Sequence, residues 1–148
     1  MERPASGVQD VVAPETLRKV RVPFVRRVTL RRRGRTEELF AVDLGLAGIF
    51  VERSQPLPRG EEIEVQFLLP GNAIPIAAAG RVAWWHPPGA KLVSKALPAG
   101  LGVEFEVLSA WDGDRLRHFI LEHLRREPRR RRFQPQWPEA GGEEDGEP

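Results

Sequence analysis

Residues 38–52 have the sequence ELFAVDLGLAGIFVE, in which two apolar, β-like runs flank a short segment with one carboxylate and two glycines. Aspartate and glycine are common in tight turns, because an aspartate side chain can bond its own backbone and glycine tolerates backbone angles that other residues avoid. The stretch therefore predicts two neighbouring strands, Glu38–Val42 and Ile49–Glu52, joined by the turn Asp43–Gly48.

Apolar and polar residues alternate on both sides of this stretch, which predicts further strands. These strands cover residues 22–31, 62–69, 76–86 and 101–107. Glycine and proline mark the turns between them. Six short strands with regular turn signals predict an all-β fold, a six-stranded antiparallel barrel that leaves no exposed strand edge.

One C-terminal α-helix is expected after the last strand. Ser109 and Asp112 have the spacing of an N-terminal capping box. Apolar residues then recur at helical spacing, and Pro128 stops the helix. This apolar stripe, which we expect to pack on the barrel, consists of Leu116, Phe119, Ile120 and Leu124.

The predicted barrel and helix together cover residues 18–126. Residues 1–17 contain prolines and few large apolar groups, so we expect a flexible N-terminal arm. Residues 127–148 begin with a basic run, Arg129–Arg132, and end with an acidic one, Glu143–Asp145. Such a segment buries too little apolar surface to offset its chain entropy, and we expect it to be disordered.

The composition is that of one soluble globular domain. The chain has 148 residues, of which 41% are hydrophobic, and no apolar run reaches the roughly 20 residues of a membrane-spanning helix. The N-terminus lacks the apolar region of a secretory signal, so we expect a cytoplasmic location. With no cysteine, disulfides and thiolate metal sites are excluded. The histidines and carboxylates show no catalytic or metal-ligand spacing, so we expect no enzyme activity, no metal and no cofactor.

Nearly all of the basic residues are arginines, the exceptions being Lys19, Lys91 and Lys95. Arginine pairs with phosphates through two parallel hydrogen bonds and stacks on bases, which suits a nucleotide ligand. A GC-rich genome that favours arginine codons explains the same bias. The bias therefore does not by itself identify a nucleotide partner.

The order of these segments resembles the PilZ domain, a small β-barrel that binds the bacterial second messenger cyclic di-GMP. In that family an Arg-x-x-x-Arg motif precedes the first strand, and an Asp/Asn-x-Ser-x-x-Gly motif joins the second and third. Arg21, followed by Val-Pro, matches the second arginine, and Asp43 and Gly48 match the ends of the second motif.

The later strands of the chain fit the same family. Gly80–Trp84 resembles the fifth strand of the barrel, and Gly100–Phe105 resembles the sixth. The terminal helix follows at the expected place. The resemblance therefore covers residues 18–124 and implies the fold of a PilZ-like barrel with one C-terminal helix.

The resemblance also implies a ligand site. Arg21, with Arg18, would clamp the phosphates of cyclic di-GMP. Asp43 would accept hydrogen bonds from the guanine edge, and Gly45 and Gly48 would shape the turn. As a glycine, Gly48 can adopt a positive φ and lets the backbone approach a ligand closely.

Two positions depart from the family motifs. The place of the first arginine is held by Leu17, one residue before Arg18, and the serine of the second motif is Gly45. A micromolar site has about 8 kcal/mol of binding energy. Losing the hydroxyl contact costs about 0.5–1.5 kcal/mol, and losing a charge-assisted arginine contact costs about 1.5–3 kcal/mol. If Arg18 reaches the missing position, only the smaller loss remains.

Two hypotheses of function follow from the resemblance. In the first, the chain is a cyclic di-GMP receptor or adaptor that acts through an unidentified protein partner, with ligand binding ordering the arm. In the second, it is a degenerate PilZ-like interaction module that does not bind cyclic di-GMP. Either would serve bacterial signalling, for example in motility or cell-envelope machinery.

A third hypothesis is a basic barrel that binds nucleic acid nonspecifically. Arg31–Arg33 and Arg35 cluster at the first hairpin, where they form either a nucleic-acid surface or a solvated hairpin tip. The Arg129–Arg132 run, with Phe133 and Trp137, offers a docking peptide for nucleic acid, an anionic membrane or an acidic partner. Alternatively, the acidic end of the tail neutralises the charge of this basic run within the same chain.

Trp84 and Trp85 lie on opposite faces of one predicted strand. One of them is expected to fill the core. The other is expected to lie under the terminal helix or to face outward as an anchor for a partner.

Overall fold

The computed structural model describes residues 14–88 and 97–126. Their elements, in chain order, are α2 Pro14–Lys19, β1 Val22–Pro23, β2 Arg27–Arg32, β3 Arg35–Leu44, β4 Gly48–Glu52, β5 Glu62–Phe67, β6 Ile76–His86, β7 Gly100–Leu108 and α3 Ala110–Arg126. None of these helices has the length and apolar content needed to cross a membrane. The predicted tail and most of the predicted arm lie outside the described residues.

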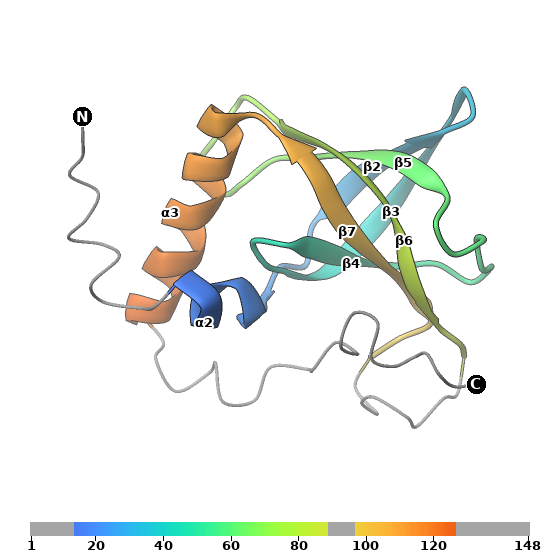
Figure 1. Ribbon diagram of the computed structural model, residues 1–148, viewed down its shortest axis with the longest axis horizontal. Helices are drawn as coiled ribbons and strands as arrows, with labels where there is room; N and C mark the ends of the chain where they lie inside the picture. Colours follow the sequence, from blue (N-terminus) through green and yellow to red (C-terminus); the bar gives the residue numbers. More distant parts are fainter. Residues whose placement is uncertain (1–13, 89–96, 127–148) are drawn as a thin grey trace.

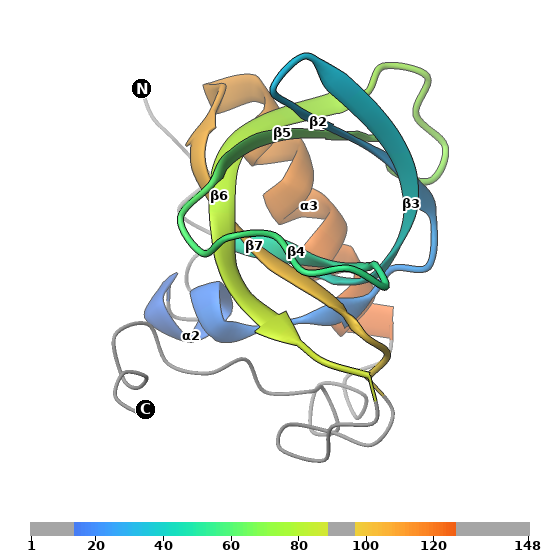
Figure 2. The ribbon, with the colours of Figure 1, turned by 90° about the vertical axis from the view of Figure 1, so that its right-hand side faces the viewer.

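Six strands form a closed antiparallel barrel. They pair in the order β3, β2, β5, β6, β7 and β4, and β4 also pairs with β3, which completes the ring seen end-on in Figure 2. The seventh strand, β1, adds to the end of β3 by pairing Val22 with Leu44 and Pro23 with Asp43. The predicted six-stranded barrel is confirmed, and β1 is an additional strand.

The first predicted strand is interrupted. Val22, Phe24, Val28 and Leu30 are buried on one side, as their alternation indicated. However, β1 ends at Pro23 and β2 begins only at Arg27. The bonding to β3 continues past Pro23, since the N–H of Phe24 donates to the carbonyl of Val42 at 3.0 Å. The interruption is a shift of register by one residue, because Pro23 lies opposite Asp43 whereas Arg27 lies opposite Phe40.

Helix α3 lies across one end of the barrel (Figures 1 and 2). Leu116 and Ile120 are fully buried and Leu124 nearly so, which confirms the predicted stripe. Phe119, also in the stripe, packs edge-on against Phe24 with ring centroids 5.8 Å apart, and Phe24 in turn packs against Phe67 of β5 at 5.6 Å. These aromatic contacts join the helix to the barrel core.

The start of α3 makes half of the predicted capping box. The backbone N–H of Asp112 donates to Ser109 Oγ at 3.0 Å. The Asp112 carboxylate does not return to Ser109 but accepts hydrogen bonds from the backbone of Ala77, at 3.3 Å, and from Arg115, at 2.9 Å. Asp112 therefore ties the first turn of α3 to β6.

Helix α2 crosses the boundary that we predicted between the arm and the barrel. It spans Pro14–Lys19, and Leu17 is 5% exposed within the main hydrophobic cluster. An apolar side chain placed there gains from burial in the way that core residues do. The chain is thus anchored on the barrel from Leu17 onward.

We expect Ile120→Ala to lower the free energy of unfolding by about 2–5 kcal/mol, because it leaves a cavity between α3 and the barrel. Urea denaturation followed by circular dichroism measures this loss. His118→Ala, on the exposed side of the same helix, is the control and should change stability by no more than about 0.5 kcal/mol. Equal losses for the two variants would contradict the packing of α3 described above.

Candidate functional site

The turn between β3 and β4 carries the residues that the sequence singled out. The N–H of Gly45 donates to the carbonyl of Gly48 at 2.9 Å, which closes the turn. The N–H of Phe105 donates to the carbonyl of Ala47 at 2.8 Å, which ties the turn to β7. The turn is therefore fixed by the barrel as well as by its own bond.

A β-bulge directs Asp43 to the outer face of the barrel. The pairing of β3 with β4 shifts between Ala41, which lies opposite Val51, and Asp43, which lies opposite Phe50. Bulges re-aim side chains in this way. The chain neighbour of Asp43, Leu44, belongs to the hydrophobic core, and successive side chains of a strand point to opposite faces. The Asp43 carboxylate therefore lies outside the core.

Arg21 and Asp43 form a buried ion pair on this outer face. Arg21 Nε and Nη2 both donate to Asp43 Oδ1, at 3.1 Å and 2.8 Å. The side chains are only 5% and 2% exposed. The prediction that these two residues belong to one site is consistent with their contact, whereas a turn in which Asp43 bonds only its own backbone is not what the structure shows.

The pair is ionic despite its burial. Loss of water on burial lowers the pKa of Arg21 from the ordinary arginine value, and the negative charge of Asp43 and its hydrogen bonds raise it again. An arginine nevertheless keeps its proton near neutral pH. Each charge therefore stabilises the other in a position that would be costly for either alone.

The other predicted ligand residues are placed differently. Gly45 is buried directly beneath the Arg21 guanidinium. Gly48 is buried at the start of β4, opposite Glu104 of β7. Gly48 does not use the positive φ that glycine allows, since the glycines with such angles in the described segments are Gly34, Gly60 and Gly71. Strand β4 pairs in extended geometry from Gly48 onward, which needs no left-handed residue.

Leu17 and Arg18, which stand at and next to the place of the first motif arginine, differ in their exposure to solvent. Arg18 is exposed on the last turn of α2. Leu17, which stands where the family has its first arginine, points into the core. The structure therefore brings Arg21, Asp43 and Gly45 together, and it leaves Arg18 on the surface.

An aromatic row extends the outer face beside Asp43. Phe50 lies opposite Asp43 on one side and opposite Gly102 on the other, and Gly102 lies opposite Trp84. The rings of Phe50 and Trp84 are 5.4 Å apart, and His86 packs edge-on against both. Trp84 crosses closely over Gly102, since a Cβ built there would lie 1.9 Å from Trp84 Nε1.

The sequence indicated part of this row. The opposite orientation of the two tryptophans is confirmed, because Trp85 packs against the core and Trp84 packs on the outer side against Phe50. Of the two predicted places for the second tryptophan, facing outward is the one that the structure shows; the packing of Trp84 on Phe50 was not predicted. The contribution of Phe50 was missed, since one buried aromatic residue in an apolar strand gives no sign that it faces outward.

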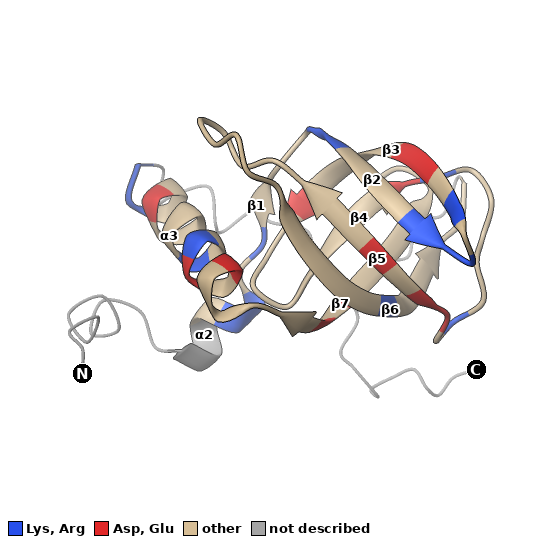
Figure 3. Ribbon diagram, turned by 90° about the horizontal axis from the view of Figure 1, so that it is seen from above, with Lys and Arg blue, Asp and Glu red and all other residues tan. Residues whose placement is uncertain are grey.

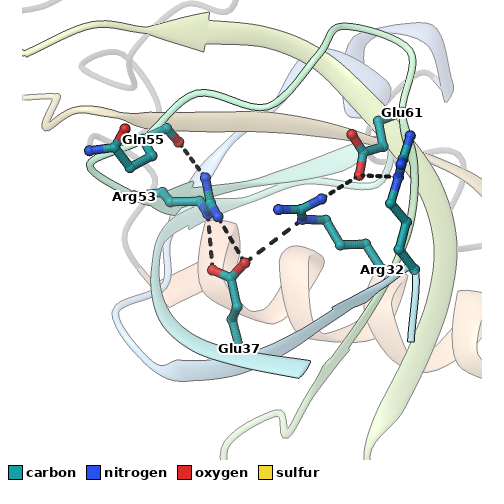
Figure 4. A network of polar contacts seen from close by, with 6 residues as sticks. Arg32, Glu37, Arg53, Gln55 and Glu61 are labelled. Carbon is teal, nitrogen blue, oxygen red and sulfur yellow. Dashed lines mark hydrogen bonds and ion pairs between the residues drawn. The ribbon is translucent and has the colours of Figure 1, made fainter. Parts of the chain in front are cut away.

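Arg31, Arg32 and Arg33 of the β2–β3 hairpin are paired with carboxylates. Figure 3 shows acidic and basic residues interleaved over this end of the barrel, away from α3. Arg32 contacts Glu61 at 2.9 Å and Glu37 at 3.8 Å, and Arg53 binds both oxygens of Glu37 at 2.9 Å and 2.8 Å (Figure 4). The hydrogen bonds from Arg53 lower the pKa of Glu37. Arg33 also lies 3.6 Å from Glu61.

No metal site accompanies these groups in the part of the chain that the structure describes. No three His, Asp or Glu side chains there gather as metal ligands would. The chemistry of the site is therefore that of a guanidinium, a carboxylate and backbone amides on the surface of a barrel.

The described residues thus form a closed barrel that holds paired basic and acidic groups on its outer face, with the short helix α2 and the longer helix α3 packed on it. The sequence matches the model of the PilZ domain over residues 16–122, and the chain belongs to the PilZ domain family. Proteins of this family are binding and adaptor modules. No curated protein matches the chain in sequence.

Solved structures have the same fold. The Bacillus subtilis inhibitor of motility MotI/DgrA matches with a TM-score of 0.63 and 17% identity, over 74% of this chain and 52% of MotI. The PilZ domain of Escherichia coli YcgR, solved with cyclic di-GMP, matches with a TM-score of 0.50 and 18% identity, over 77% of this chain and 95% of that domain. The chain thus spans about half the length of MotI, and these likenesses show the fold.

We expect Arg21→Met to lower the free energy of unfolding by about 3–5 kcal/mol, because it leaves the Asp43 carboxylate buried without its counter-charge. The double variant Arg21→Met with Asp43→Leu should lose clearly less, since it removes both charges. Urea denaturation of the two single variants, Arg21→Met and Asp43→Leu, and of the double variant measures the coupling.

The exposed pair Arg27–Glu38, whose side chains are 65% and 61% exposed, supplies the control. Arg27→Met should cost at most about 1 kcal/mol. If Arg21→Met lowers the free energy of unfolding by no more than Arg27→Met does, the buried pair contributes little to stability.

Proposed function

We propose that this chain is a receptor for cyclic di-GMP that acts as an adaptor toward a protein partner. The observation that carries the proposal is the contact between Arg21 and Asp43 on the outer face of the barrel. These are the two charged residues that match the family motifs. Membership of the PilZ family supports the ligand, and the YcgR domain solved with cyclic di-GMP supplies a relative of the same fold.

The two side chains have the chemistry that this ligand requires. The planar fork of an arginine matches a phosphate oxygen pair, and charge-assisted bonds of this type are among the strongest hydrogen bonds in proteins. A carboxylate can accept both N–H groups on the Watson–Crick edge of guanine. Arg21 would therefore bind the ligand phosphate and Asp43 would select guanine.

Ligand binding at these residues requires a change in the protein. Arg21 and Asp43 are almost completely buried, so a ligand reaches them only if the segment from α2 to Arg21 moves. Arg18 lies on that segment and would come near the ligand in the same movement. Because Leu17 holds α2 on the core, the movement would also change the surface that α2 presents.

This change of surface is the signal that we propose a partner detects. The partner would belong to bacterial motility or cell-envelope machinery. MotI, whose fold matches, is described as an inhibitor of motility, which supports this class of partner. We further propose that the chain acts in the cytoplasm and has no catalytic activity of its own.

Isothermal titration with cyclic di-GMP tests the proposal. We expect saturable binding in the micromolar range, with no binding of GTP at the same concentrations. Asp43→Asn should weaken binding by about tenfold or more, because an amide cannot accept both guanine N–H groups. Arg27→Met is the matched control and should leave the affinity unchanged. If Asp43→Asn binds as the wild type does, the assignment of this site is wrong.

A second candidate function keeps the fold without the ligand. It is favoured by the burial of Leu17, which stands at the position of the first motif arginine. In that case the barrel is an interaction module, and titration to near-millimolar cyclic di-GMP produces no heat.

Nonspecific nucleic-acid binding has less support. Arg31 and Arg32 of the first hairpin already contact Glu37, Glu61 and Glu64, so phosphates would have to displace carboxylates from these two arginines. Binding of this kind would fall steeply with salt concentration.

A further inference from the structure

Gly45 lies in a space that admits no side chain. A Cβ built on Gly45 would lie 2.6 Å from Arg21 Nη1 and 2.7 Å from the carbonyl oxygen of Val20. The Cδ of Arg21 would be 3.3 Å away. The backbone of Gly45 has no positive φ, so its angles do not require glycine. The requirement comes from the chain that lies on top of it.

The group on top of it is the Arg21 side chain in its buried position. That position is fixed on one side by the two hydrogen bonds to Asp43 and on the other by contact with Gly45. Any side chain at position 45 would push the guanidinium away and would also press on the Val20 peptide. The absence of a side chain at position 45 is therefore a condition for the Arg21–Asp43 pair as observed.

We propose that Gly45 sets the resting state of the site by allowing Arg21 to lie buried against Asp43. A residue with a Cβ at position 45 would displace Arg21 toward solvent and uncover Asp43. Glycine in place of the motif serine therefore does more than remove a hydroxyl group: it also determines the position of the Arg21 side chain. The consequence for the ligand rests on the proposed function, whereas the consequence for Arg21 does not.

The effect on affinity follows from the population of the open state. When only a fraction of molecules has the site open, the apparent affinity falls by that fraction, so a site that is open in about one molecule in a hundred binds about a hundredfold more weakly. Opening the site by substitution removes this penalty. Substitution of Gly45 should therefore strengthen ligand binding, although it weakens an ion pair of the folded protein.

The experiment compares Gly45→Ala and Gly45→Ser with the wild type in the full chain. The Arg21 Nε–H signal, assigned by its loss in Arg21→Lys, is followed by NMR hydrogen exchange without ligand. Both Gly45 variants should exchange this proton at least about tenfold faster, and titration should give at least about tenfold tighter binding of cyclic di-GMP. Gly113→Ala is the control, since a Cβ there has nothing within 4 Å, and it should change neither.

A double-mutant cycle keeps the test decisive if Gly45→Ala is poorly stable. The loss of stability caused by Gly45→Ala should be smaller in an Arg21→Ala background, where the guanidinium is gone. A Gly45→Ala protein that folds only in that background is the extreme form of the same result. Equal losses in both backgrounds, or an Arg21 proton as protected as in the wild type, would overturn the proposal.

The ligand measurement is interpreted separately from the exchange measurement. Faster Arg21 exchange with unchanged affinity would show that Arg21 does not control entry, which overturns the proposed effect on binding. No binding by the wild type or by either Gly45 variant would refute the proposed function. In that event the exchange rate and the mutant cycle still decide whether Gly45 holds Arg21 in place.

Discussion

The pairing of β3 with three other strands determines where every part of the site lies. This strand pairs with β2 along its first half, and with β4 and β1 near its end. The pairing with β4 closes the barrel, and the pairing with β1 brings Arg21 beside Asp43. Arg21 can be buried here because β3, the strand that pairs with β1, also carries Asp43, whose carboxylate compensates the charge of the arginine. The closure of the barrel and the chemistry of its outer face thus depend on one element.

The sequence predicts the barrel well because its signals are local and periodic. The strand predicted at residues 76–86 is β6, Ile76–His86, and the apolar stripe of α3 packs as its spacing indicated. Burial of one face imposes these periods on the sequence. The break between β1 and β2 was missed, because the alternation from Val22 to Leu30 continues across the shift of register that separates Pro23 from Arg27.

The site is less predictable because it depends on contacts between distant residues. The bulge between Ala41 and Asp43 leaves the apolar pattern of β3 almost unchanged, yet it decides which way Asp43 points. The family motifs single out Arg21 and Asp43, but these residues lie 22 positions apart, and nothing in the motifs indicates that the arginine is buried against the carboxylate. Gly45 indicated only a missing hydroxyl; the contact of its backbone with Arg21 is visible only in three dimensions.

The pairing of β4 with β7 has a consequence for how the chain folds. It joins Phe50 to Gly102, whereas the hairpins β2–β3 and β5–β6 join residues close in sequence. Forming a contact between segments that are distant in sequence costs more chain entropy than forming a local one, so such contacts tend to form late. The turn has its own bond between Gly45 and Gly48, but it is also held by the bond of Ala47 to Phe105 of β7. We therefore expect it to reach its final shape only after this closure, which low φ-values for folding at Val51 and Val103 would support. A chain still in the course of folding would then have its hairpins but no site, and a ligand of this turn would recognise only finished molecules.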